Sequence, residues 1–421
     1  MKYMTVTDLN NAGAYNNAIC EGGNIMTIEA MGRALRRTAA YRPILDTPEM
    51  RQLDLLLDSL GTGNGQQAAG AYAQLFYLLR QDGYRSLGDW LFDRLRDEDF
   101  PYARLMERGG RDPELEKAAC RELELFRTLA QTDWGAELAK LEPEAELPGW
   151  TGECPFTVES LTEFYRVHGS GLFARCRAFL WEDGELFPVE DPDCPEPDEM
   201  LGYELQRDQV IANTRAMLEG RAVNNVLLYG DSGTGKSATV KSLLALPGFE
   251  RLRLIEVQKE GLADMPRLIR TLSGRQLKFI LFIDDLAFDQ DDKTYSVMKT
   301  ILEGGLEKRP ANVAIYATSN RRHLVRQTFS DRAGDEVDAS ETIQEKTSLA
   351  ERFGLRIPYL ALNQGEFLDM VERMAALHGV EMDRQELRTG AIRWEMRHPG
   401  RTPRTAKQFI ASLHLNHNNK E

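Results

Sequence analysis

Eight residues in the middle of the chain, Gly230 to Ser237, constrain its fold most strongly, because they fit the pattern G-x-x-x-x-G-K-[ST]. The apolar run 224–229 before them predicts a strand, and the segment 237–246 predicts a helix. A glycine-rich turn in this context surrounds a phosphate with backbone N–H groups. Lys236 would supply a cation and Ser237 would hold Mg²⁺. The residues expected to bind the nucleotide here are Gly230, Asp231, Ser232, Gly233, Thr234, Gly235, Lys236, Ser237 and Ala238.

Five short apolar runs in the second half of the chain alternate with helical stretches. Besides 224–229, they are 252–257 (LRLIEV), 278–283 (KFILFI), 313–317 (VAIYA) and 355–360 (LRIPYL). Strands that are apolar along their whole length are typical of a parallel sheet with helices on both faces. We therefore expect an αβα sandwich with a parallel five-stranded sheet, followed by a small C-terminal helical lid. Ligands bind beyond the carboxyl ends of such strands.

Two of these runs end in polar side chains that suit phosphate chemistry. Asp284-Asp285 follows the third run, and Thr318-Ser319-Asn320 follows the fourth. Asp284 is expected to bind Mg²⁺ through water, and Asp285 stands where a general base for an attacking water is expected. Asp285 is one methylene shorter than glutamate, which indicates a tighter geometry or slow hydrolysis. Asn320 can orient the water; the alternatives are a solvated Asp-Asp turn and an ordinary turn asparagine.

Several arginines are candidates for contact with a transferring phosphoryl group. Arg352 lies in 349–354 (LAERFG), at the edge of the core, where it is expected to reach a neighbouring subunit's site as an arginine finger. Its alternative is a surface salt bridge. Arg404 follows Pro403 at the start of a lid helix and is expected to sense the γ-phosphate. Arg321 and Arg322 stay open between phosphate, a neighbouring subunit and solvent.

The segment 202–206 (GYELQ) begins a helix that runs through 210–218, just before the first strand. Its backbone is well placed to contact an adenine base, and Tyr203 and Gln206 are the residues expected to do so. No N-K-x-D sequence, which reads guanine, follows the fourth run. ATP is therefore favoured over GTP as the nucleotide, together with Mg²⁺.

The first 200 residues have a different pattern. Apolar residues recur three and four apart in 50–60, 71–79, 87–95 and 115–129, which is typical of amphipathic helices, and 158–180 fits one or two more. Segments 142–150 and 188–198 are rich in proline and acidic residues, as connectors are. We expect an acidic, all-helical N-terminal domain with its linker over 1–200, a core over 201–362 and a lid over 363–421.

The charge is divided unevenly along the chain. Residues 1–200 hold 20 Lys and Arg against 36 Asp and Glu, a net −16, whereas residues 201–421 hold 32 against 30, a net +2. An acidic surface repels nucleic acid, whose affinity for proteins comes largely from neutralised phosphates. Nucleic acid is thus possible as a partner but not indicated, and the second half would contact it.

Other classes of protein are not favoured. No run of about 18 apolar residues is present, so no membrane span is expected. The first 25 residues lack the basic and apolar regions of a secretory signal, and a cytoplasmic location is expected. Five cysteines, none of them in a C-x-x-C pair, indicate neither a zinc site nor a disulfide framework.

The order of Walker A, Walker B, sensor 1, arginine finger and sensor 2 motifs resembles the AAA+ ATPase superfamily over about residues 200–415. More narrowly, GYELQ, LRLIEVQKEGLADMPRLIRTL, FILFIDDL, IYATSNRRHL and EKTSLAERFGL resemble the bacterial P-loop family catalogued as domain of unknown function 815. This resemblance implies an AAA+ fold with ATP and Mg²⁺ between core and lid. Relatives among helicase loaders and initiators also carry Asp-Asp at the Walker B tip.

The leading hypothesis is an ATPase in a homo-oligomer, in which Arg352 acts on the adjacent subunit and nucleotide state changes the conformation of the N-terminal domain. That domain would bind an unknown protein client. One alternative is an ATP-dependent nucleic-acid remodeller of the helicase-loader type, favoured by Arg321 and Arg322. Another is a nucleotide switch or scaffold with negligible hydrolysis, for which Asp285 is the hint.

Overall fold

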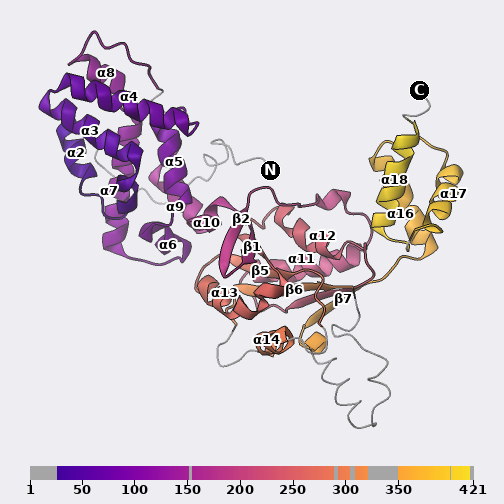
Figure 1. Ribbon diagram of the computed structural model, residues 1–421. Helices are drawn as coiled ribbons and strands as arrows, with labels where there is room; N and C mark the ends of the chain where they lie inside the picture. Colours follow the sequence, from indigo (N-terminus) through magenta and orange to yellow (C-terminus); the bar gives the residue numbers. More distant parts are fainter. Residues whose placement is uncertain are drawn as a thin grey trace. The chain divides into compact units, whose positions relative to one another are not determined.

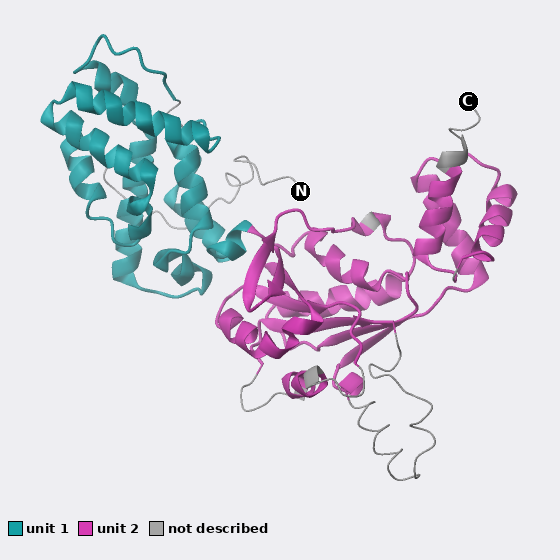
Figure 2. Cartoon of the chain, viewed as in Figure 1, with its two compact units in different colours: residues 1–175 teal, residues 176–421 magenta. Residues whose placement is uncertain are grey.

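The computed structural model describes residues 26–150, 154–288, 293–303, 309–320, 349–398 and 400–417. The chain divides into two compact units, residues 1–175 and 176–421 (Figure 2). This division comes earlier than the predicted boundary after residue 200, because a hairpin within 178–189 pairs with the sheet of the second unit. Over the ranges described, no helix combines the length and the apolar character needed to cross a membrane.

The first unit is helical throughout its described residues, as predicted for the N-terminal region (Figure 1). Its core is a single cluster that includes Trp90, Phe126 and Tyr165, all fully buried. The elements are α2 (Ile28–Leu35), η1 (Arg42–Asp46), α3 (Pro48–Thr62), α4 (Gly65–Gln81), α5 (Leu87–Asp97), α6 (Pro101–Glu107), α7 (Pro113–Gln131), α8 (Trp134–Ala139), α9 (Val158–His168) and α10 (Leu172–Arg175).

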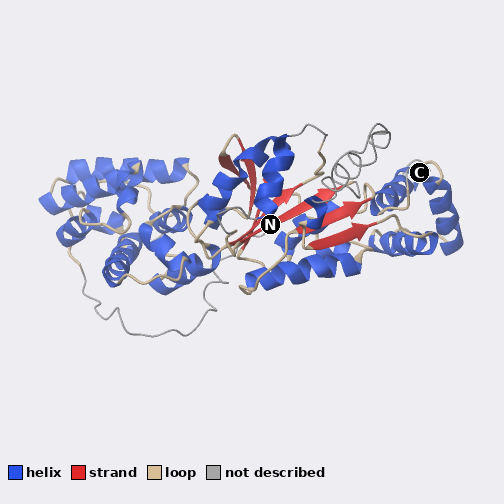
Figure 3. Cartoon of the chain, turned by 90° about the horizontal axis from the view of Figure 1, so that it is seen from below, coloured by secondary structure: helices blue, strands red, loops and turns tan. Residues whose placement is uncertain are grey.

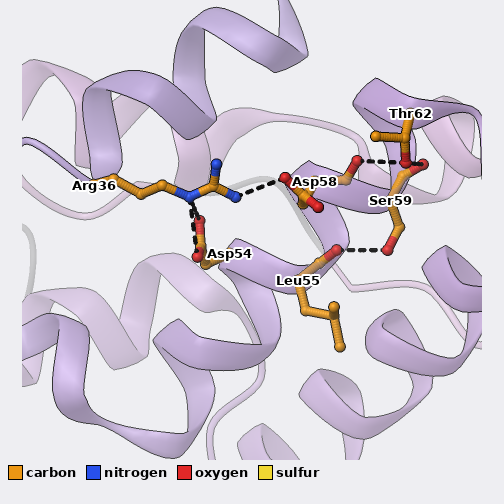
Figure 4. Close-up of polar contacts among 6 residues, drawn as sticks. All are labelled: Arg36, Asp54, Leu55, Asp58, Ser59 and Thr62. Carbon is orange, nitrogen blue, oxygen red and sulfur yellow. Dashed lines mark hydrogen bonds and ion pairs between the residues drawn. The ribbon is translucent and has the colours of Figure 1, made fainter.

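Local signals explain where α3 begins and how it is held. The Thr47 hydroxyl accepts the N–H of Met50, and Gly63 ends the helix in the left-handed region at φ 74°. Arg36, at the end of α2, donates to Asp54 and Asp58 of α3, at 2.9 Å each (Figure 4). Because these side chains are about half exposed, the pairs orient α2 on α3 more than they stabilise the fold.

A buried carboxylate fixes the loop between α2 and η1. Glu122 of α7 is 8% exposed, and Oε1 accepts the backbone N–H groups of Ala39 at 2.8 Å and Ala40 at 3.2 Å. Oε2 accepts the N–H of Tyr41 at 3.0 Å. Three backbone donors, of which those of Ala40 and Tyr41 are buried, therefore depend on one side chain for their hydrogen bonds.

Replacing Glu122 with glutamine should lower the free energy of unfolding of the first unit by about 2 kcal/mol, because an amide N–H₂ would face a buried donor. Urea unfolding followed by circular dichroism measures the loss. The matched control is Glu124→Gln on the same helix, which breaks a partly exposed pair with Arg127 at 3.0 Å and should cost less than about 1 kcal/mol. Equal losses for the two variants would contradict the role assigned to Glu122.

The second unit contains one seven-stranded sheet in the order β2-β1-β4-β5-β6-β3-β7. All neighbouring pairs are parallel except β1 and β2. The strands are β1 (Ala178–Glu182), β2 (Glu185–Val189), β3 (Val226–Gly230), β4 (Leu252–Val257), β5 (Lys278–Ile283), β6 (Val313–Ser319) and β7 (Leu355–Tyr359). The five predicted strands are therefore confirmed as β3 to β7.

The predicted count of five strands is wrong, because β1 and β2 extend the sheet beyond β4. The sequence predicts helices over 158–180 and a connector over 188–198, whereas the last helix before the sheet ends at Arg175 and β2 runs to Val189. Asp183 and Gly184 join the two strands at φ 49° and 77°. Two positive φ values in a two-residue loop match the twist of an antiparallel hairpin.

Helices cover the sheet, and a separate helical group lies beyond the carboxyl ends of the strands (Figure 3). Val210 and Met217 of α11 and Val240 of α12 pack in one core cluster with alternate residues of β3 to β7. The lid has its own cluster around Phe367, Val371 and Phe409. The remaining elements are η2 (Pro197–Glu199), α11 (Glu204–Leu218), α12 (Lys236–Ser242), η3 (Leu243–Ala245), η4 (Lys259–Asp264), α13 (Met265–Leu272), α14 (Lys293–Glu303), α16 (Gln364–Leu377), α17 (Arg384–Glu395) and α18 (Pro403–His417).

Candidate functional site

The loop between β3 and α12 is held against the edge strand β7. The N–H of Asp231 donates to Tyr359 O at 2.9 Å, and the Asp231 carboxylate accepts the N–H of Ala361 at 2.7 Å. Gly230 has φ 138°, and a Cβ placed on it would lie 2.2 Å from Tyr359 O. Only a glycine fits this close approach of two backbones. The Asp231 carboxylate thus helps to hold the loop against the segment that follows β7.

Lys236 opens α12 with its side chain folded into the loop. Its Nζ donates to Gly230 O at 3.1 Å, to Asp231 O at 2.7 Å and to Asn320 Oδ1 at 2.9 Å. Burial lowers the pKa of the ammonium, and the nearby carboxylate of Asp231 partly offsets this effect. The structure therefore places a positive charge, partly removed from water, where the sequence predicts phosphates.

Ser237 and Asp284 meet at the neighbouring position. Ser237 Oγ donates to Asp284 Oδ1 at 2.6 Å, which joins the first turn of α12 to the end of β5. A hydroxyl and a carboxylate are oxygen donors of the kind that Mg²⁺ prefers, and Mg²⁺ commonly takes its other ligands from phosphate and water. Within the described ranges no group of three or more His, Cys, Asp or Glu residues is arranged to hold a metal. The pair fits Mg²⁺ delivered with a nucleotide.

Asp285 and Asn320 are brought together at the tips of β5 and β6. Asn320 Nδ2 donates to Asp285 Oδ1 at 2.8 Å, while its Oδ1 accepts from Lys236. The backbone of Asp285 has φ 49°, a left-handed conformation that is uncommon for a residue other than glycine. Its N–H donates to Thr318 Oγ1 at 2.9 Å. Asp285, Asn320 and Lys236 thus form one hydrogen-bonded chain.

The lid touches the loop through the start of α18. The N–H of Arg404 donates to Gly233 O at 3.2 Å, and a Cβ on Gly233 would lie 3.0 Å from the Arg404 Cβ. The Arg404 charge also helps to lower the pKa of Lys236. Leu362, just after β7, donates its N–H to Arg401 O at 3.0 Å. Core and lid are therefore in direct contact at the predicted phosphate site.

Tyr203 and Gln206 lie at the start of α11 with their side chains directed at β7. Tyr203 is 7% exposed, stacks on Tyr359 with ring centroids 5.0 Å apart, and donates its hydroxyl to Leu360 O at 2.6 Å. Burial raises the pKa of that hydroxyl. Gln206 Nε2 donates to Pro358 O at 3.4 Å. Both side chains attach α11 to the edge of the sheet, and the base contact predicted for them stays a prediction.

Arg352 lies apart from the other predicted residues. It precedes β7, and Leu355 pairs with Val226 at the amino end of β3, whereas Tyr359 pairs with Gly230 at the carboxyl end. A five-residue strand spans roughly 15 Å, so the start of β7, three residues after Arg352, is separated from the loop by about that distance. It is half-buried, and its N–H donates to Leu349 O at 3.2 Å.

Arg321 and Arg322 lie outside the described residues. The same holds for Asp289, Asp291 and Asp292, whose sequence favours a solvated acidic loop over metal ligands. Conversely, Thr318 and Tyr359 both contact the site, although no sequence motif points to either residue. Thr318 stands two residues before Asn320, and side chains two apart in a strand share a face. That spacing was the available signal for Thr318.

Comparison with known proteins gives one family match and matches to solved structures of low similarity. The family model described as "Protein of unknown function (DUF815)" matches residues 174–417. A search of curated proteins gave no match. The solved structure of the Thermotoga maritima RuvB Holliday junction branch migration motor has 18% identity and a TM-score of 0.34, covering 51% of this chain and 63% of that one. A substituted form of the same protein gives 18% and 0.35, with the same coverage.

This chain therefore spans less than two thirds of the length of those structures. The family match, by contrast, covers more than half of this chain and includes each motif that the sequence analysis singled out from Gly202 to Arg404. The matched residues include all seven strands of the sheet, the loop between β3 and α12, and the lid. The chain belongs to the family described as Protein of unknown function (DUF815).

Proposed function

We propose that the chain binds ATP with Mg²⁺ and hydrolyses it as an AAA+ ATPase. The observation that carries this proposal is the hydrogen-bonded chain from Lys236 through Asn320 to Asp285, beside the pair of Ser237 and Asp284. These contacts join the loop after β3 to the tips of β5 and β6. A phosphate-binding cation, oxygen ligands for a metal and a candidate base then lie within one small volume.

Each residue has a distinct role in this proposal. The backbone N–H groups of residues 230–238 and the Lys236 ammonium bind the phosphates, and Ser237 and Asp284 hold the metal. Mg²⁺, when bound, neutralises phosphate charge and orients the terminal phosphoryl group. Asp285 accepts the proton of the attacking water, and Asn320 orients that water. Arg404 contributes positive charge from the lid.

The position of Arg352 supports action on a neighbouring subunit. Arg352 lies just before the amino end of β7, and the strand's length of roughly 15 Å separates that end from the chain's own loop, so Arg352 is better placed to reach another copy's site. In this proposal the chain forms a homo-oligomer in which each site is completed by the adjacent subunit. The N-terminal helical unit would then bind a protein client and respond to nucleotide state.

Arg352→Ala should leave ATP binding unchanged and lower turnover by at least about a hundredfold, because an arginine finger stabilises charge in the transition state. Phosphate release by the assembled protein measures turnover. Mixing Arg352→Ala with Lys236→Ala subunits provides the sharper test. The second variant retains Arg352, so mixed assemblies should recover activity that neither variant has alone.

The matched control is Arg356→Ala, which removes an exposed arginine four residues further along, within β7. It should hydrolyse ATP at the wild-type rate. Action in trans is refuted if mixed assemblies stay inactive, or if monomeric protein hydrolyses ATP equally well with and without Arg352.

A second candidate function is a nucleotide switch that hydrolyses ATP negligibly. It is favoured by the Asp285 carboxylate, which already accepts a hydrogen bond from Asn320 and extends from a left-handed backbone position. A base held in this way must be released before it can accept a proton. Steady-state phosphate release distinguishes the two, since a switch would bind ATP tightly without multiple turnovers.

A further inference from the structure

One buried hydroxyl lies between the two acidic residues of the site. Thr318 Oγ1 donates to Asp284 Oδ1 at 2.5 Å and accepts the backbone N–H of Asp285 at 2.9 Å. Thr318 is 2% exposed, so little water is available to replace either bond. The Thr318 hydroxyl therefore donates one hydrogen bond to Asp284 and accepts one from Asp285. In the proposed function, these two residues bind Mg²⁺ and activate the water.

The sheet register puts Thr318 in this position. In the parallel pair of β5 and β6, Ile283 lies opposite Ala317, so the next residue on each strand brings Thr318 beside Asp284. The backbone of Thr318 also accepts the N–H of Leu286 at 2.7 Å. Residues 284–286 thus turn away from β5 while attached to Thr318 through both its side chain and its main chain.

This attachment maintains a backbone conformation that Asp285 would not adopt unaided. At φ 49°, a residue with a Cβ is strained, and such a conformation persists where surrounding contacts hold it. The hydrogen bond from the Asp285 N–H to Thr318 is one such contact. The direction in which the Asp285 carboxylate leaves the main chain consequently depends on Thr318.

The same hydroxyl also orients Asp284. Asp284 Oδ1 receives hydrogen bonds from Ser237 at 2.6 Å and from Thr318 at 2.5 Å. When Ser237 serves as a metal ligand, its oxygen faces the metal, and Thr318 remains as a donor to the carboxylate. Hydrogen bonds of this kind, behind the ligands themselves, fix ligand orientation and tune metal affinity.

We propose that Thr318 is a positioning residue that sets Asp284 for Mg²⁺ and Asp285 for the attacking water. This inference rests on the proposed function, and it adds a residue that touches neither phosphate nor metal. Its effect should appear in the Mg²⁺ dependence of nucleotide binding, which a purely structural hydroxyl would not alter.

The test compares Thr318→Val, which keeps the shape without the hydroxyl, with Thr318→Ser, which keeps the hydroxyl. A fluorescent ATP analogue is titrated without metal and then with increasing Mg²⁺, and phosphate release is measured in parallel. For Thr318→Val we expect metal-free affinity within about threefold of wild type, a Mg²⁺ half-saturation raised about tenfold or more, and hydrolysis lowered about 10- to 100-fold. Thr318→Ser should restore both to within about threefold of wild type.

Thr214→Val is the control for the loss of a buried threonine hydroxyl. Thr214 is fully buried in the same unit, where its hydroxyl donates to Val210 O at 2.8 Å and contacts the Tyr316 hydroxyl at 2.8 Å. This variant should match wild type in Mg²⁺ dependence even if it is less stable. Should Thr318→Val not fold, Thr318→Ala provides the same comparison.

Three different results would overturn the proposal. If wild-type binding responds to Mg²⁺ and Thr318→Val responds identically, or if Thr318→Ser is as impaired as Thr318→Val, then the hydroxyl does not position the acidic pair. If wild-type binding does not respond to Mg²⁺ at all, the proposed function itself fails, and the inference fails with it.

Discussion

Replacing Lys236 with alanine should weaken ATP binding more than about a hundredfold, a loss of about 3 kcal/mol. The Lys236 ammonium stands inside the loop after β3, within 3.1 Å of the Gly230 and Asp231 carbonyls. Burial already lowers its pKa, so phosphates that enter the loop would meet a cation poorly compensated by water. Titration of a fluorescent ATP analogue measures the change.

Lys241→Ala is the matched control, because Lys241 lies on the same helix and its Nζ faces Glu256 at 3.9 Å. It should bind ATP as the wild type does. A thermal shift gives an independent reading: ATP at about 100 times its Kd stabilises a folded protein by about 2.7 kcal/mol, and Lys236→Ala should lose this stabilisation. Unchanged affinity in Lys236→Ala would place the nucleotide somewhere other than this loop.

The central strands were predictable because they are buried on both faces. The runs 252–257 and 278–283 match β4 and β5 residue for residue, and 313–317 lies within β6. A strand covered by helices on both sides must be apolar along its whole length, which leaves a local signal in the sequence. The parallel arrangement of the strands also places Asp284, Asp285 and Asn320 together, since the carboxyl ends of parallel strands share one edge of the sheet.

The hairpin of β1 and β2 was missed because its pairing with β4 is a tertiary effect. Its outer strand β2 is partly exposed and includes Pro188, whereas β1 is mostly buried. An isolated hairpin buries too little apolar surface to be stable, so its sequence resembles that of a connector. The pair Asp183-Gly184 between two aromatic runs was nevertheless a usable hairpin signal.

The side-chain contacts of the site depend on the register between strands, which composition does not reveal. The stacking of Tyr203 on Tyr359 follows from the packing of α11 on the edge strand, which the sequence alone does not show. The engagement of Thr318 with two acidic residues likewise needs the pairing of β5 with β6. The finger role of Arg352 is predicted from its motif. The register of β7 against β3 shows, in addition, that the strand following Arg352 begins at the end of the sheet opposite the loop.

Gly230→Ala should lower the free energy of unfolding of the second unit by about 4 kcal/mol. Gly230 has φ 138°, which L side chains rarely adopt, and the added Cβ would lie 2.2 Å from Tyr359 O and 2.7 Å from its carbonyl carbon. Strain of the backbone and overlap with a second main chain each cost about 1–3 kcal/mol. The overlap cannot be relieved by rotating a side chain, so β7 must move away from β3. Chemical denaturation of the full chain measures the loss.

Gly248→Ala separates the two contributions. Gly248 also has a positive φ, 81°, but a Cβ there meets nothing within 4 Å. It should cost only about 1–2 kcal/mol, from the backbone conformation alone. If both variants lost the same free energy of unfolding, β7 would move away from the added Cβ without an energetic cost. The contact with the edge strand would then not stabilise the loop. A larger loss at Gly230 would instead show that close packing against the main chain of β7 stabilises the loop after β3, and β7 is the strand that leads to the lid.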